Sequence, residues 1–210
     1  MKIILKIMVT ASLCASVSFA APQKGTMKDP RDGKTYKTVK IGNQVWMAEN
    51  LAFEIGGNAG STSECLIAGG NGKIANCKQY GLYYSAVAAF STACPDGWHL
   101  PSVEEFEKLL NYAQSSVNLK SKNGWNTYPQ PSGNGKDKYG FNARPAGACM
   151  VITDGGKCLY MDEGNYSYFW TSTNLAYAFL GAPHADYGFD VAKVVDGMIM
   201  EWYPVRCIKD

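Results

Sequence analysis

Histidine is scarce in this chain, and no two cysteines stand at Cys-x-x-Cys spacing. His99 and His184 are the only histidines among the 210 residues. A structural zinc site takes a set of cysteine and histidine ligands at short, regular spacings. The sequence therefore predicts no zinc site.

A long apolar run is missing beyond the first twenty residues, and so is an excess of either charge. The whole chain carries 20 Lys+Arg and 18 Asp+Glu, and residues 1–20 contribute two lysines and no acid, which leaves 18 of each. A membrane-spanning helix needs about 20 mostly apolar residues, while nucleic acids and anionic membranes are bound by basic surfaces. We expect no membrane span in the mature chain and no nucleic-acid partner.

The first twenty residues have the three-part layout of a secretory signal peptide. Lys2 and Lys6 give a positive start, an apolar stretch follows, and Ser18–Ala20 offers small residues for cleavage after Ala20. The stretch is short for a membrane anchor, and the residue before Cys14 is too large for a lipoprotein site. We predict an exported protein, placed in the periplasm, at the cell surface or outside the cell.

The remaining chain is predicted to form one domain behind a short leader. Residues 21–28 contain proline, glycine and polar residues, which is typical of a linker, and residues 29–210 have a length usual for one domain. The 22 glycines indicate a fold rich in loops.

Six cysteines remain after the predicted cleavage, and an even number in an exported chain predicts disulfide bonds. Closure of the shortest loops favours the pairs Cys65–Cys77 and Cys149–Cys158, which leaves Cys94–Cys207.

Local signals predict a hairpin and two helices. Bulky residues flank Gly42-Asn43, which predicts a hairpin over Thr35–Leu51. Ser102 and Glu105 match a capping box at the start of a helix over Ser102–Ala113. A second, short helix is expected over Ser85–Phe90.

The C-terminal third is predicted to consist of strands, which gives an α+β fold of mostly antiparallel sheets. A long ordered loop rich in glycine, proline, asparagine and serine is expected over Ser121–Tyr139. The expected strands are Phe169–Thr173, Ala176–Leu180, Gly188–Val194, Met198–Tyr203 and Val205–Lys209.

Several longer motifs resemble those of the Fibrobacter succinogenes major paralogous domain (FISUMP) family. They occur in order along the chain: Asp32–Leu51, Tyr80–Tyr84, Cys94–Ser102, Tyr139–Gly147, Phe169–Thr173 and Val205–Cys207. The resemblance implies a fold similar to C-type lectin-like domains and to the formylglycine-generating enzymes, with both chain ends in one sheet. The pair Cys94–Cys207 suits that arrangement. Trp202 and Pro204 depart from the family pattern, and Pro204 predicts a bulge or strand edge.

Aromatic residues near polar ones are the candidate ligand-binding groups. Sugar rings present apolar faces that stack on exposed aromatic rings, and neighbouring amides hydrogen-bond their hydroxyls. Trp46, Trp98 and Trp170 lie in the family motifs and are predicted to be core residues, and an alternative for Trp125 is that it pins its loop to the body. The candidates are Trp125, Asn126, Tyr128, Trp202 and Tyr203.

Other chemistry receives less support from the sequence. His99 has no nucleophile at motif spacing and is predicted to be structural. Loop acids such as Asp154, Asp162 and Glu163 offer oxygens for calcium, but neither an EF-hand spacing nor the sugar-binding motifs of C-type lectins occur. We therefore expect no cofactor and no catalytic residue.

These observations favour an exported, non-catalytic binding or adhesion module for polysaccharide or a cell-surface partner. Two alternatives stay open. One is a structural component of a cell-surface assembly. The other is an enzyme, either a fibre hydrolase or an oxidase of the formylglycine-generating type, which would need a free, metal-binding thiol at Cys94 or Cys207.

Overall fold

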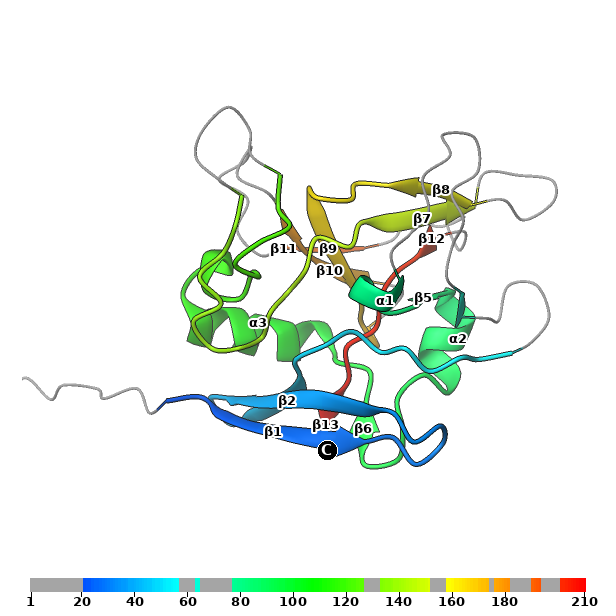
Figure 1. The fold of residues 1–210 in the computed structure, drawn as a ribbon, viewed down its shortest axis with the longest axis horizontal. Coiled ribbons are helices and arrows are strands. Elements are labelled where there is room, and N and C mark those ends of the chain that lie inside the picture. Colours follow the sequence, from blue (N-terminus) through cyan, green and yellow to red (C-terminus); the bar gives the residue numbers. More distant parts are fainter. Residues whose placement is uncertain are drawn as a thin grey trace, which may run out of the picture.

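The computed structural model describes residues 21–56, 63–64, 77–126, 133–151, 158–173, 176–181, 190–193 and 201–210 (Figure 1). The predicted signal peptide lies outside this part. Within it, no helix combines the length and the apolar character that crossing a membrane requires. Antiparallel sheets dominate and helices are few, as the predicted α+β class requires.

A five-stranded sheet holds both ends of the described chain. Its strand order is β1-β2-β3-β13-β6. The predicted hairpin is confirmed, because β2 and β3 pair antiparallel with Val39 opposite Trp46, and Gly42 takes the left-handed φ of 59° in the turn. The bounds are β1 (Gln23–Lys28), β2 (Thr35–Ile41), β3 (Gln44–Met47), β6 (Trp98–His99) and β13 (Ile208–Lys209).

Strand β1 corrects the prediction of a linker over residues 21–28. It pairs with β2 from Gln23 opposite Lys40 to Lys28 opposite Thr35. Its side chains are exposed except for the partly buried Met27. Because backbone pairing rather than side-chain burial holds this edge strand, it has no apolar alternation that could reveal it in the sequence.

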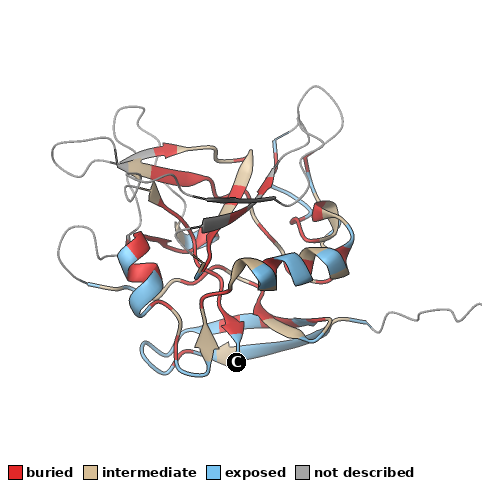
Figure 2. Cartoon of the chain, turned by 180° about the vertical axis from the view of Figure 1, so that it is seen from behind, coloured by how far each residue is buried: buried red, intermediate tan, exposed pale blue. Residues whose placement is uncertain are grey.

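Both predicted helices are confirmed. Helix α3 (Val103–Ala113) begins after Ser102, whose side chain accepts from the backbone N–H of Glu105, while the Glu105 carboxylate accepts from that of Ser102. Its buried residues are Phe106, Leu109 and Ala113, and its opposite face is exposed (Figure 2). The other helical segments are α2 (Ala86–Ser91), capped by Ser85, and the short α1 (Cys77–Tyr80) and η1 (Ser116–Asn118).

Three smaller sheets complete the fold. One has the order β11-β10-β9, another β12-β7-β8, and the third pairs β4 with β5. Their bounds are β4 (Ser63–Glu64), β5 (Tyr83–Tyr84), β7 (Ala148–Val151), β8 (Cys158–Met161), β9 (Tyr166–Trp170), β10 (Ala176–Gly181), β11 (Asp190–Lys193) and β12 (Glu201–Trp202).

The strand predicted over Met198–Tyr203 is confirmed in its described part, and the last predicted strand needs correction. Glu201–Trp202 is the described part of the strand predicted over Met198–Tyr203, and the strand predicted over Val205–Lys209 is reduced to β13. Pro204 has no N–H for a ladder, so the intervening segment makes single bonds instead. Its Val205 and Cys207 carbonyls accept from Leu51 and Met47.

Aromatic rings join the five-stranded sheet to α3 and to the sheet β11-β10-β9. Trp46 of β3 packs on Phe106 of α3 at 5.0 Å between ring centroids and on Phe141 at 5.7 Å. Phe169 of β9 lies 6.0 Å from both Phe rings. Such pairs add about 0.5–1.5 kcal/mol each beyond burial. Trp46 and Trp170 are fully buried, as predicted, whereas Trp98 is half-buried.

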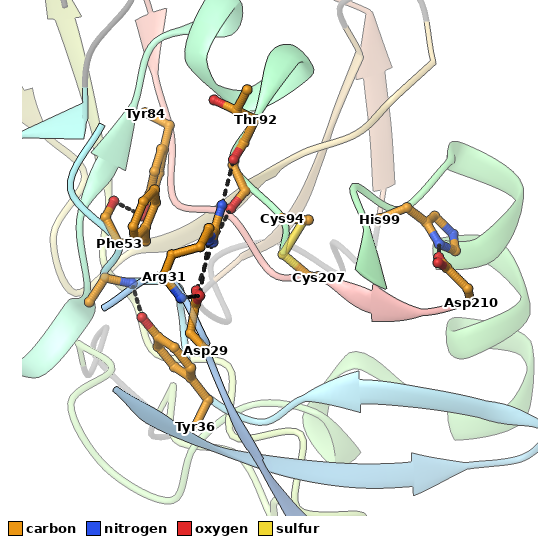
Figure 3. The surroundings of a disulfide bond; sticks show 12 residues. Asp29, Arg31, Tyr36, Phe53, Tyr84, Thr92, Cys94, His99, Cys207 and Asp210 are labelled. Atoms are coloured by element: carbon orange, nitrogen blue, oxygen red, sulfur yellow. Dashed lines mark hydrogen bonds and ion pairs between the residues drawn. A yellow bond between two sulfur atoms is a disulfide. The ribbon is translucent and has the colours of Figure 1, made fainter. Parts of the chain in front are cut away.

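The predicted disulfide Cys94–Cys207 is present (Figure 3). It joins the segment before β6 to the segment before β13. Cys77 and Cys149 are disulfide-bonded as well. Their predicted partners, Cys65 and the side chain of Cys158, lie outside the described residues.

Candidate ligand-binding groove

A groove of about 820 Å³ opens where α1 lies beside the segment that follows β3. Five stretches of the chain that are far apart in sequence supply its described lining. The first stretch is the β2–β3 region, which contributes the start of β2 and the segment after β3. The others are the stretch from α1 to Gly81, the loop at Asn123–Gly124, the loop at Asn142–Arg144, and Arg206. Polar and charged side chains predominate among them.

Arg206 forms the buried floor of the groove. Its side chain is 1 % exposed. Its Nε donates to Asn50 Oδ1 at 2.9 Å, and its terminal nitrogens donate to the carbonyl oxygens of Phe141 and Asn142. The guanidinium also lies over the rings of Phe141 and Phe169, at 4.4 and 5.3 Å from their centroids. The Arg206 side chain thus connects the last segment of the chain to three other segments, those at Asn50, at Phe141–Asn142 and at Phe169.

All hydrogen-bond acceptors of Arg206 are neutral. Burial lowers the pKa of its guanidinium to about 9, and the more distant carboxylates of Asp137 and Glu49 only partly oppose this, while the nearby Arg144 lowers it further. The group therefore stays charged at neutral pH, and no carboxylate in the described part of the chain hydrogen-bonds it.

Asn50 and Gly81 fix the wall beside this floor. The Asn50 side chain donates to the Tyr80 carbonyl at 2.8 Å while it accepts from Arg206. Gly81 has φ +79°, and a Cβ there would come within 2.7 Å of the Leu51 carbonyl oxygen. Because only glycine fits, the backbone after α1 can approach this wall closely.

Among the described lining of the groove, Glu49 supplies the one carboxylate, and it is already paired. Glu49 accepts from the backbone N–H and from the ammonium of Lys37. Two other groups of the lining are also engaged. Lys34 donates to the Ala52 carbonyl and pairs with Asp32, and the buried Tyr36 has its pKa raised to about 12, chiefly by burial, so it stays a neutral phenol.

Two cationic side chains on the walls of the groove have no ion-pair or hydrogen-bond partner among the described residues. Lys78, on α1, is exposed, and Arg144 is half-buried. Neither side chain has an ion pair or hydrogen bond in the described part of the chain. Both are available to a ligand.

The family model of the Fibrobacter succinogenes major domain matches residues 39–209. The chain belongs to this family. Comparisons with curated proteins and with solved structures found no match. The lining of the groove draws on four of the motif stretches that predicted membership: Asp32–Leu51, Tyr80–Tyr84, Tyr139–Gly147 and Val205–Cys207.

In this Fibrobacter major domain, the three predicted aromatic candidates that the structure describes are buried. Trp125 is 4 %, Trp202 8 % and Tyr203 2 % exposed. Trp125 donates from Nε1 to Ser121 Oγ at 3.0 Å and lies under the Lys120 ammonium. These contacts agree with the alternative interpretation, in which Trp125 holds its loop against the body of the domain. Trp202 packs with Tyr80 and Tyr83, and Tyr203 packs on Trp170 at 4.8 Å.

The remaining candidates have mixed outcomes. Asn126 is exposed, but its amide donates to Asn165 and it is not among the groove residues. Tyr128 lies outside the described residues. Sequence reasoning missed Asn123, Asn142, Arg144 and Arg206 as site residues. Three of the four, Asn142, Arg144 and Arg206, are polar residues inside the family motifs, and this position in the sequence could have indicated them.

The acids considered for calcium are engaged elsewhere where the structure describes them. The Asp162 carboxylate accepts from Tyr168, and the Glu163 side chain hydrogen-bonds Tyr80. Asp154 lies outside the described residues. In the described ranges, no three or more His, Cys, Asp or Glu side chains gather as a metal site would require.

His99 lies away from the groove, between two carboxylates. Its Nδ1 is 2.6 Å from Asp210 Oδ1 and its Nε2 is 3.0 Å from Glu105 Oε1 (Figure 3 shows Asp210). Burial lowers the pKa of the imidazole, but the hydrogen bonds to Asp210 and Glu105 outweigh it and raise the pKa above 6.5. Protonated His99 thus ties β6 to the capping residue of α3.

This arrangement predicts a pH-dependent contribution to stability. Because the folded-state pKa is raised, the contribution is complete below about 6.5, the unfolded value, and is lost as pH rises through the folded-state pKa. Urea unfolding of wild type and His99→Gln across this window measures it. The wild type should be the more stable at the acid end, and the two should converge at the alkaline end. A difference independent of pH would contradict the assignment.

Proposed function

We propose that this domain is an exported, non-catalytic binding module on a C-type-lectin-like scaffold, and that the groove binds a polysaccharide. One observation carries the proposal. Four of the sequence stretches that identify the family, well separated along the chain, meet around this one concave polar surface. Its volume falls within the range of roughly 300–1,000 Å³ that ligand sites in proteins have.

The chemistry of the lining suits a ligand rich in hydroxyl groups. The side-chain amides of Asn123 and Asn142 have no hydrogen-bond partner within the described ranges. An amide both donates and accepts, as a sugar hydroxyl does. The buried aromatic rings offer no stacking platform here, so hydrogen bonds and charge supply the specificity in this proposal.

The cysteines support a non-catalytic role and export. Cys94 and Cys207 are joined to each other, so neither is the free thiol that an oxidase of the formylglycine-generating type would need. Disulfide bonds persist in oxidising compartments outside the cytosol. Both points agree with the layout of the first twenty residues.

Substitution of Asn123 tests the groove directly. Asn123→Ala removes hydrogen bonds to the ligand and should weaken binding about 3- to 10-fold, because a net hydrogen bond contributes about 0.5–1.5 kcal/mol. Asn111→Ala, an equally exposed asparagine on α3, is the matched control and should bind as the wild type does. The measurement is a glycan array followed by titration with the best ligand.

Two results would count against the proposal. One is the absence of binding to every polysaccharide by the folded, disulfide-bonded protein. The other is a strong glycan interaction that neither Asn123→Ala nor other groove substitutions change, since it would place the ligand elsewhere.

A further inference from the structure

The charge of the groove differs from that of the chain. Among its described lining, Lys34, Lys78, Arg144 and Arg206 are cationic and Glu49 alone is acidic, an excess of three positive charges. Including the ion-pair partners Asp32 and Lys37 leaves that excess at three. The chain beyond residue 20 is balanced, so the described lining of the groove has a net positive charge that the chain as a whole lacks.

The unpaired part of this charge lies at defined places. Arg206 is on the floor with neutral acceptors only, and Arg144 and Lys78 are on the walls. The nearby Glu163 carboxylate forms no ion pair with Arg144 in the described part of the chain and hydrogen-bonds Tyr80 instead. Arg144 and Arg206 are close enough for their like charges to oppose one another. An anion between them would relieve that repulsion.

We infer that the groove selects a polysaccharide that carries carboxylate groups, with Arg144 and Lys78 binding a carboxylate above the buried Arg206. This inference rests on the proposed function and names its ligand class. A planar guanidinium such as that of Arg144 matches a carboxylate with two parallel hydrogen bonds. Asn123 and Asn142 remain for the neighbouring sugar hydroxyls. A nucleic acid would need a basic surface extending well beyond the groove, and the balanced chain does not provide one.

A matched pair of ligands isolates the carboxylate. The probes are an oligogalacturonate and the same oligomer with its carboxyl groups methyl-esterified, titrated calorimetrically into the disulfide-bonded protein. The acid should bind at least about tenfold more tightly than the ester, because charge-assisted hydrogen bonds are the stronger ones. The difference should shrink at high salt, since the walls of the groove are open to solvent.

Substitutions assign the effect to residues. Arg144→Gln should reduce the affinity for the acid about tenfold and leave that for the ester unchanged, and Lys78→Gln should do the same with a smaller factor because Lys78 is more exposed. Lys108→Gln, an exposed lysine of α3, is the control and should leave both affinities unchanged.

The outcomes separate the two proposals. Equal binding of acid and ester, or a preference for the acid that Arg144→Gln and Lys78→Gln leave intact, overturns the carboxylate site. If Asn123→Ala still weakens binding in that case, the groove remains the glycan site. Failure of both probes and of every neutral polysaccharide overturns the proposed function as well.

Discussion

Replacing Arg206 with methionine should lower the free energy of unfolding by about 3–5 kcal/mol. Methionine fills much of the same volume but leaves three acceptors without their donor, namely Asn50 Oδ1 and the carbonyl oxygens of Phe141 and Asn142. A buried acceptor left unsatisfied costs about 1–3 kcal/mol, and water from the groove will offset part of this. The loss is large beside a total stability of about 5–15 kcal/mol.

The size of this effect follows from the kind of partners that Arg206 has. Replacing a buried ion pair by apolar residues is often neutral, because the desolvation cost of both charges disappears. Arg206 contacts neutral acceptors, so its removal leaves no opposite charge unpaired, but it does leave three hydrogen-bond acceptors in two segments without their donor. Arg206→Lys should fall between methionine and wild type, because one ammonium cannot reach all three acceptors in the geometry of a guanidinium.

Arg144→Met is the matched control for Arg206→Met. It makes the same exchange in the same groove, but the Arg144 side chain has no hydrogen bond or ion pair in the described ranges. Its effect on urea unfolding should stay within about 0.5 kcal/mol. If the two variants proved equally stable, Arg206 would not be the structural centre of the groove.

Sequence reasoning succeeded where a signal is local. The hairpin depends on a Gly-Asn turn that neighbouring residues define, and the start of α3 depends on Ser102 and Glu105, which satisfy each other's backbone N–H groups. Each signal lies within a few residues, so no knowledge of the rest of the chain is needed.

The groove could not be predicted in this way, because it exists only after distant segments have met. Asn50 and Arg206, which hydrogen-bond in its floor, are 156 residues apart. The burial of Trp125, Trp202 and Tyr203 could not be predicted for a related reason. The composition of the loop around Trp125 indicates that it lies at the surface, but not whether the ring points outward, and here Ser121 and Lys120 hold it against the body.

Removing the Cys94–Cys207 disulfide is the other change with a large expected effect. The double variant Cys94→Ala/Cys207→Ala should lose about 2–5 kcal/mol, because the bond closes a long loop, of sequence separation 113, and restricts the unfolded chain. The double variant avoids an unpaired thiol that could exchange with other disulfides. Chemical reduction would be less specific, since Cys77 and Cys149 are also disulfide-bonded.

The native structure around the bond should survive its removal, which makes the effect measurable. Arg31 donates to the carbonyls of Thr92 and Ala93 at 2.7 and 2.8 Å and to the Asp29 carboxylate (Figure 3). These bonds hold the segment before Cys94 against the turn between β1 and β2 without any help from the sulfurs.

The other side of the bond is held independently as well. The Cys207 carbonyl accepts from Met47, and Ile208 pairs with both Trp46 and His99. The double variant should therefore keep the wild-type near-ultraviolet circular dichroism and unfold at a lower urea concentration, with a slope that rises because the unfolded chain is no longer restricted by the bond. An unchanged urea midpoint would show that β13, two residues long, is anchored by Arg206 and the sheet alone, and that the covalent link contributes little to the fold.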